Sequence, residues 1–341
     1  MTDTKKHIKF KNPIKAVSSA CSGGKPEHEG PYGRYLDILA SSDDLKTGTF
    51  EKAEAETVRL TVNALMSKAK ITEKDVDLML GGDLMNQCTS TGYGLEGFDI
   101  PYLGLYGACS TFALGLLTAG CLIDSGHINS AIVVASSHFC SAERQFRFPL
   151  EYGAIANTTA QTTVTGAGAV YLSRASENES GTMLTGGLYG IVCDNGIKDA
   201  SNMGAAMATA AADTILRYFE ASGESISEFD RIATGDLGTE GVSLAKEFIS
   251  KKGINSDGVL CDCGVMIYDT EKQNVGCGGS GCGCSAVMTS GYFFDEMKKK
   301  KINRMALVGT GAMMSPQSLL QGMSIPAVAH MVKFENRQVM K

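Results

Sequence analysis

The strongest constraint on the fold of this chain is an internal repeat. The segment 75–84 (DVDLMLGGDL) resembles 228–237 (EFDRIATGDL), and the segment 128–134 (INSAIVV) resembles 302–308 (INRMALV). Helical patterns precede these segments in both copies, so helix, strand, loop, helix and strand recur in one order, about 150 to 175 residues apart. Self-similarity along a chain indicates a repeated architecture. A duplicated βαβαβ unit is therefore predicted; the alternative is two unrelated α/β units.

Helical and strand patterns alternate within the repeat. Apolar residues recur at helical spacing in 50–69, and 76–80 is a short apolar run that leads into glycines. The range 110–125 predicts a second helix, and 131–135 is a continuous apolar run typical of a buried parallel strand. Such alternation predicts a layered α/β fold.

The boundary between the two copies is placed by composition. The range 177–181 is the one polar, turn-rich stretch near the midpoint of the 341 residues. We therefore predict one half at 1–176 and the other at 177–341, which is a usual size for an α/β unit.

Charge and cysteine usage narrow the function classes. The net charge of −6 gives no support to nucleic-acid binding. Residues 1–13 are polar and basic, without the apolar core of a secretory signal, so the 11 cysteines are expected to be free thiols. No charge occurs in 100–123, but its many small and polar residues predict a closely packed buried helix rather than a membrane span. Neither a signal peptide nor a transmembrane helix is expected.

One cysteine stands where a nucleophile could be activated. Cys109 lies between a glycine-containing turn and the start of an apolar helix, where free amide N–H groups and the helix dipole would lower the pKa of a thiol. The competing reading is a small residue that fits a crowded helix start. By the repeat, its counterpart is the glycine-rich segment 276–284.

A zinc site is the other chemistry that these cysteines suggest. Four thiols come in two pairs, Cys261 with Cys263 and Cys282 with Cys284. Only one residue separates the members of each pair, whereas zinc sites usually leave two to four. No metal site is predicted.

Specific runs carry a resemblance to a known family. They are 136–140 (SSHFC), 145–153 (QFRFPLEYG), 278–286 (GGSGCGCSA) and 322–326 (GMSIP). With the duplicated unit and the Ala-Cys-Ser elbow, the chain resembles the thiolase and ketoacyl-synthase superfamily over about residues 8–334. Within it, the chain is most similar to the stage V sporulation protein AD family of spore-forming bacteria. The resemblance implies a thiolase-like fold, in which two pseudo-symmetric βαβαβ halves form a layered αβαβα core.

The catalytic positions depart from the condensing enzymes of this superfamily. Those enzymes set two further groups beside the cysteine, commonly two histidines or a histidine and an asparagine. The first position falls here at Gly235 or Asp236, and Cys277 stands at the second. An anionic Asp236 would raise the pKa of the thiol. Cys109 is therefore predicted to be a vestigial nucleophile, and condensation to be undetectable.

The resemblance also implies a function and partners. Family members belong to the machinery that loads dipicolinic acid, often as its calcium chelate, into the developing spore. They are soluble proteins held at the inner spore membrane by membrane-embedded partners. No cofactor is implied, with calcium present only as part of the chelate, and superfamily pairing implies a homodimer. Two alternatives stay open, namely an acyl-thioester condensing enzyme that uses Cys109 and a purely structural subunit of a membrane complex.

The candidate ligand site gathers the inherited pocket and two arginines. A glycine-rich backbone suits one carboxylate of dipicolinate, a guanidinium fork suits the other, and an aspartate suits calcium. The alternative for the arginines is pairing with Glu143 and Glu151 on a surface loop. The predicted ligand-binding residues are Cys109, His138, Arg144, Arg147, Asp236, Cys277, Gly278, Gly279 and Ser280.

Overall fold

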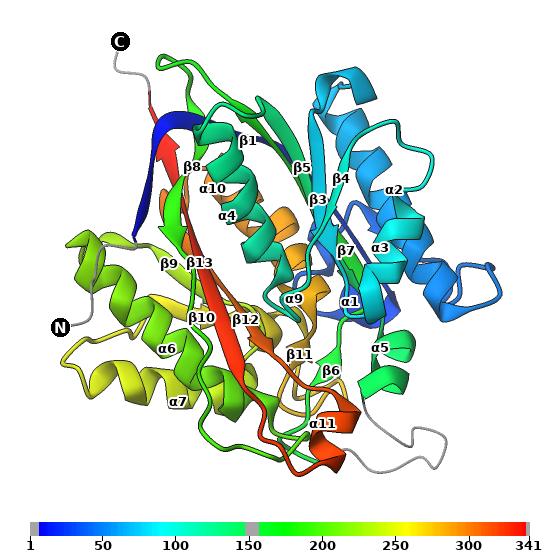
Figure 1. The fold of residues 1–341 in the computed structure, drawn as a ribbon, viewed down its shortest axis with the longest axis vertical. Coiled ribbons are helices and arrows are strands. Elements are labelled where there is room, and N and C mark those ends of the chain that lie inside the picture. The colour runs from blue at the N-terminus through cyan, green and yellow to red at the C-terminus, as the bar shows by residue number, and fades with distance from the viewer. Residues whose placement is uncertain (1–6, 147–156, 339–341) are drawn as a thin grey trace.

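The computed structural model describes residues 7–146 and 157–338 (Figure 1). Each half contributes five principal strands. The first half consists of β1 (Ile8–Gly23), α1 (Lys25–Glu29), η1 (Gly33–Tyr35), β2 (Ile38–Leu39), α2 (Phe50–Ala69), η2 (Glu73–Asp75), β3 (Leu78–Gly82), η3 (Asn86–Cys88), α3 (Thr89–Gly94), β4 (Tyr102–Gly104), α4 (Thr111–Asp124), β5 (Ser130–Ser137), α5 (Phe139–Phe146), β6 (Thr162–Thr163) and β7 (Gly166–Arg174).

The second half repeats the arrangement. It consists of β8 (Gly181–Leu188), α6 (Met203–Ser222), η5 (Ile226–Glu228), β9 (Arg231–Thr234), α7 (Gly238–Ser250), β10 (Leu260–Asp262), α8 (Cys263–Ile267), β11 (Gly279–Ser280), α9 (Cys282–Met288), the π-helical segment η6 (Thr289–Phe293), α10 (Phe294–Lys298), β12 (Arg304–Ala312), α11 (Pro316–Leu320) and β13 (Ala327–Arg337).

The two halves have the same strand order. The sheet runs β4-β3-β5-β7-β1 through the first half and β10-β9-β12-β13-β8 through the second. Equivalent pairs have the same direction: β3 with β4 and β9 with β10 are parallel, and β5 with β7 and β12 with β13 are antiparallel. The sequence repeat therefore corresponds to a repeated topology. Strands β1 and β8 pair with each other, which joins the two halves into one continuous set of strands.

Five layers result from how the helices cover these strands (Figure 1). Helix α4 contacts strands of both halves, and it contacts α9, so these two helices form the central layer. Helix α2 covers the outer face of the first half, and α6 covers that of the second. The αβαβα core that the sequence implied is confirmed.

The predicted helices agree closely with the observed ones. Helix α2 covers the predicted range, and the uncharged segment forms α4, whose residues are mostly buried. Within the described residues, 7–146 and 157–338, no helix has the length and hydropathy needed to cross a bilayer. One helical region is irregular: after α9 the chain changes to π-helical geometry over Thr289–Phe293 before α10 begins. There Gly291 packs so closely that an added Cβ would lie 2.9 Å from the Sγ of Cys21.

Candidate functional site

A tight turn places Cys109 at the start of α4. Ala108 has a positive φ of 50°, a backbone conformation that is uncommon for residues other than glycine. The hydroxyl of Ser110 donates to the carbonyl of Gly107 at 2.6 Å, and that of Thr111 donates to the carbonyl of Ala108 at 2.7 Å. These bonds hold the turn, and Cys109 is buried within it.

Asp236 reaches Cys109 from the other half of the molecule. The carboxylate follows β9 and is fully buried; it accepts hydrogen bonds from the Thr310 hydroxyl at 2.7 Å and from the Gly281 amide at 2.9 Å. The Cys109 thiol also donates to it. The structure therefore brings together these two predicted site residues, which stand 127 positions apart in the sequence.

The electrostatics of this pair oppose a reactive thiolate. Burial, and next the charge of Asp236, raise the pKa of Cys109 well above its usual value. Burial raises the pKa of Asp236 to about 7. The effect of Asp236 on the thiol is as predicted, but the expectation that the turn and helix start lower the pKa of Cys109 is wrong, because desolvation of the charged form outweighs the backbone dipoles.

His138 does not take the place of the missing histidines. Its Nε2 lies 2.7 Å from the carbonyl oxygen of Asp43, and its Nδ1 accepts from the amide of Cys140 at 3.2 Å. Burial lowers the pKa of the ring. Both ring nitrogens are thus used, Nε2 by the loop between β2 and α2 and Nδ1 by the start of α5, so the imidazole is not oriented toward Cys109 as a base.

The glycine-rich segment uses much of its backbone in pairing with β6. The carbonyl of Gly278 accepts from the amide of Thr162, and that of Ser280 accepts from the amide of Val164, both at 2.9 Å. Gly279 and Ser280 form β11, which is parallel to β6. The segment therefore supports the Asp236 site as a packed strand and is less open than the sequence suggested.

Cys277 is held by the chain that precedes β6. Its Sγ donates to the carbonyl of Thr159 at 3.0 Å, and its amide donates to the carbonyl of Ala160 at 2.9 Å. The thiol is buried. Cys277 is thus a packed side chain in the structure.

The predicted site residue Arg144 is not brought to this centre. Arg144 is half-exposed on α5 and forms an ion pair with Glu51. Arg147 and Glu151 lie outside the described residues. Arg144 thus pairs with Glu51 rather than with Glu143, which is buried and accepts from the hydroxyl of Thr163 at 2.8 Å. The pairing of Arg147 with Glu143 or Glu151 stays a prediction.

A cavity of about 1220 Å³ lies beside the Cys109–Asp236 pair. Gln161 lies between the cavity and this pair of residues. It lines the cavity, and its Nε2 donates to the carbonyls of Asp236 at 2.6 Å and Gly279 at 3.1 Å. Much of the wall is apolar and aromatic, and among its lining residues are His138, Phe139, Phe146, Tyr268, Val275 and Leu319. This volume suits a small-molecule ligand.

The cavity wall contains a carboxyl group that the sequence analysis missed. Glu27 is only 3% exposed; it accepts from the amide of Thr165 at 3.0 Å and from the hydroxyl of Tyr268. Burial raises its pKa. The only hint in the sequence is its place in the first turn of a short proline-initiated helix, where a carboxylate usually caps.

Metal ligands are not clustered in the parts of the chain that the structure describes. No group of three or more histidine, cysteine, aspartate or glutamate side chains there could hold an ion. Cys263, Cys282 and Cys284 are instead buried in the main apolar core.

One protein family matches nearly the whole chain. The family described as Stage V sporulation protein AD (SpoVAD) matches residues 4–335. A relative described as stage V sporulation protein AD, from Bacillus subtilis (strain 168), is 39% identical over 326 residues, which cover 96% of this chain and 95% of the relative.

Solved structures share the fold at low sequence identity. Cerulenin-bound OleA from Xanthomonas campestris has a TM-score of 0.60 and 14% identity, covering 97% of this chain and 100% of its own. The 3-oxoacyl-[acyl-carrier-protein] synthase III from Aquifex aeolicus VF5 has a TM-score of 0.56 and 12% identity, covering 96% and 99%. At such identities the likeness shows the thiolase-like fold alone.

Proposed function

Because the chain belongs to the stage V sporulation protein AD family, we propose that it binds dipicolinic acid and aids its uptake into the developing spore without condensing acyl groups. The contact between Cys109 and Asp236 is the observation that argues against a condensing activity. A carboxylate raises the pKa of the thiol, whereas a condensing enzyme needs a group that lowers it. The site therefore suits binding better than acyl transfer.

The charge of the cavity favours the calcium chelate over the free dianion. Among the residues that the structure describes, four acidic ones line it, namely Glu27, Glu29, Asp43 and Glu143, against one lysine, Lys272. Ionised carboxylates repel a dianion, whereas a calcium chelate of dipicolinate carries no net charge. A carboxylate oxygen is a ligand that calcium prefers, and the aromatic rings of Phe139 and Tyr268 offer apolar surface to the pyridine ring. We place the ligand in this cavity, with Glu27 as its acidic contact.

Calorimetry with dipicolinate, with and without calcium, tests the proposal. We expect the chelate to bind more tightly than the free acid, and Glu27→Gln to weaken chelate binding about tenfold, since one charge-assisted contact contributes that much. Glu240→Gln is the matched control, because Glu240 is exposed on α7 and does not line the cavity. No binding by the wild type, or equal binding by both variants, would contradict the site.

The condensing-enzyme alternative has a separate test. Incubation with an acyl thioester, followed by intact-mass measurement, should show no adduct on the wild type beyond that seen on Cys109→Ala. A stoichiometric adduct that disappears in the variant would establish acyl transfer and overturn the proposed absence of chemistry.

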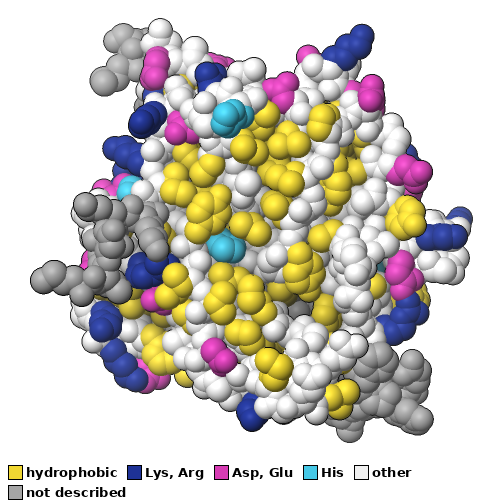
Figure 2. Space-filling model, viewed as in Figure 1, with side chains coloured by type: hydrophobic (Ala, Val, Ile, Leu, Met, Phe, Trp, Pro, Cys, Tyr) yellow, Lys and Arg dark blue, Asp and Glu magenta, His cyan; other side chains and the backbone are white. Residues whose placement is uncertain are grey.

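An apolar face supports the proposed homodimer. Figure 2 shows hydrophobic side chains gathered over the middle of the face that carries α4, β8 and β13. Tyr106, Ile191 and Val192 are 51%, 47% and 59% exposed.

Strand β4 lies at the edge of the sheet with its residues exposed, so a second copy can extend the sheet there. Sedimentation should show a dimer that Val192→Lys weakens; a monomeric wild type would refute it.

Membrane-embedded proteins of the same uptake system are the other proposed partners, and they would hold the protein at the inner spore membrane. Flotation with vesicles checks this: the purified protein alone should stay unbound, and it should float once those partners are reconstituted.

A further inference from the structure

A second concave site lies away from the ligand cavity and shares no lining residue with it. This site, which we name the β1 cleft, has a volume of about 240 Å³. It opens between the middle of β1, the segment after η1, the end of α2 and the η6–α10 helix. At the cleft, the pairing of β1 with β7 shifts register between Ala16 and Ser18, so the strand bulges there.

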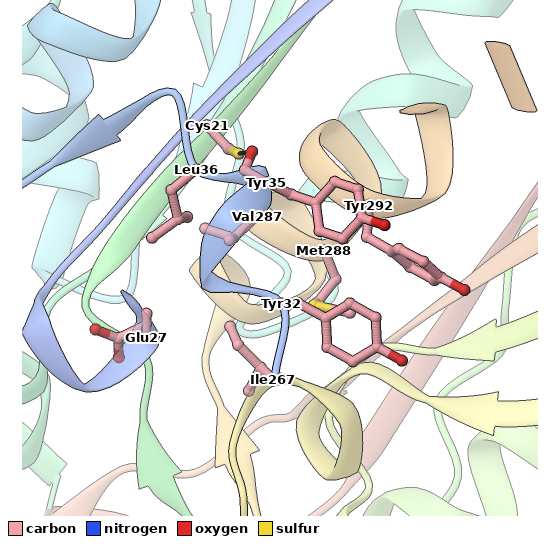
Figure 3. A pocket seen from close by; sticks show the side chains of 9 residues that line it. All are labelled: Cys21, Glu27, Tyr32, Tyr35, Leu36, Ile267, Val287, Met288 and Tyr292. Carbon is pink, nitrogen blue, oxygen red and sulfur yellow. Dashed lines mark hydrogen bonds between the residues drawn. The ribbon is translucent and has the colours of Figure 1, made fainter. Parts of the chain in front are cut away.

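Tyr35, which lines the β1 cleft, packs in a group of tyrosines whose other members, Tyr32 and Tyr292, line a neighbouring pocket. The ring centroids of Tyr35 and Tyr292 are 5.3 Å apart, and those of Tyr32 and Tyr292 are 4.5 Å apart (Figure 3). The guanidinium of Arg34 lies 5.0 Å from the Tyr35 centroid and donates to the Tyr35 hydroxyl at 3.2 Å. A ring held by its neighbours thus holds Arg34 at the cleft through a cation–π contact.

The charges of the β1 cleft do not cancel. Lys68 pairs with Asp37 at 2.8 Å, and Asp295 pairs with Lys299, which is not itself among the lining residues. Two lining cations are left over, because Arg34 and Lys298 have no ion pair with any residue in 7–146 or 157–338. Lys298 begins the four-lysine run at the end of α10, where a positive charge favours the helix dipole. The helix end does not provide an acidic side chain to pair with it.

A buried hydroxyl in the cleft also has no partner. Ser290 is one of the residues that line the cleft and is 3% exposed, and its buried hydroxyl makes no hydrogen bond within the described part of the chain. Ser290 lies in the π-helical segment, a geometry that is frequent at functional sites. A buried hydroxyl without a partner costs free energy, which a bound ligand would recover.

We infer that the β1 cleft binds a phosphate group. The guanidinium of Arg34 presents paired N–H donors to phosphate oxygens, Lys298 supplies a second positive charge, and the Ser290 hydroxyl donates from the floor. The small volume admits a phosphate and a short substituent rather than a large cofactor. The same chemistry would recognise a phosphorylated metabolite or the headgroup of an anionic lipid.

Titration of the full chain with inorganic phosphate at low ionic strength, by calorimetry, tests the inference. Arg34→Gln and Lys298→Gln should each weaken binding at least tenfold, because each removes a charge-assisted contact. Ser290→Ala should weaken it less, and it changes no charge. Lys252→Gln is the matched control: Lys252 is exposed, lies outside the cleft and has no ion pair among the described residues.

The outcomes separate the two sources of phosphate. Binding of free phosphate that depends on Arg34 and Lys298 assigns a soluble ligand. Flotation with phosphatidylcholine vesicles only when they contain phosphatidate, with the same dependence, assigns a lipid headgroup. The inference fails if the wild type binds neither probe, or if Lys252→Gln weakens binding as much as Arg34→Gln and Lys298→Gln.

Discussion

Asp83 and Asp236 occupy the same place in the two halves, but their partners differ. Each follows an equivalent strand, β3 or β9, and each is fully buried. Asp83 accepts from the amide of Met85 at 2.8 Å and from the amide and hydroxyl of Thr91 at 2.6 and 2.7 Å. All these donors lie within eight residues of it. Asp83 therefore holds its own loop.

The partners of Asp236 come from distant segments. They are Thr310 on β12, Gly281 before α9, and Cys109 from the first half. The two halves thus have a carboxylate at the same strand end. Asp83 stabilises its own loop, whereas Asp236 connects the two halves at the candidate site. The lesson is that equivalent positions in a repeat need not keep equivalent roles.

The largest expected effect concerns Glu54, the buried acidic neighbour of Asp83. Glu54 is fully buried on α2, accepting from the hydroxyls of Ser136 and Ser141; burial and then the charge of Asp83 raise its pKa to about 8. The folded protein therefore holds a proton that the unfolded chain releases above pH 4.5, and stability falls as pH rises from about 4.5 to about 8. Glu54→Gln should raise the free energy of unfolding by roughly 5 kcal/mol at pH 9 and leave it nearly unchanged at pH 4.5.

Chemical denaturation across this pH range measures the Glu54 effect. Asp236→Asn is the comparison. Because the pKa of Asp236 is about 7, the part of the stability that depends on its proton should be lost by about that pH. Between pH 7 and 8, the fall of the free energy of unfolding with rising pH should become smaller in Glu54→Gln but not in Asp236→Asn. Identical profiles for wild type and Glu54→Gln would refute the raised pKa.

The second-largest effect is expected on the reactivity of the Cys109 thiol, which should depend on Asp236 and not on Asp83. Asp236→Asn removes the charge that raises the pKa of Cys109, so alkylation of this cysteine by iodoacetamide at pH 8 should accelerate at least about tenfold. Asp83→Asn is the symmetric control and should leave the rate unchanged. Peptide mass spectrometry resolves Cys109 from the other thiols, and equal rates in both variants would remove Asp236 as the cause.

The smallest effect is expected from the two threonines that donate to these carboxylates. Thr91→Val and Thr310→Val should each lower the free energy of unfolding by about 1 to 2 kcal/mol, since each leaves a buried carboxylate one donor short. Only Thr310→Val should also change the alkylation rate of Cys109. A change with Thr91→Val would mean that the two carboxylates are coupled through the fold.

Local patterns in the sequence determined much of the architecture. The repeat predicted matching halves, helical periodicity predicted α2 and α4 to within one residue, and the family-like runs predicted the layered core. They also predicted that Asp236 would oppose the thiol of Cys109. These features could be predicted because periodicity, strand-end loops and motif spacing are properties of neighbouring residues.

Contacts between distant segments were decided by the tertiary structure alone. The sequence did not show that Glu27 and Gln161 line a cavity, that both nitrogens of His138 are already used, or that Arg144 pairs with Glu51. It placed Cys109 in a turn that should favour a thiolate, whereas burial raises the pKa of the thiol instead. The physical reason is that desolvation and pairing depend on what packs against a group, and that packing is set by chain segments that are distant in the sequence.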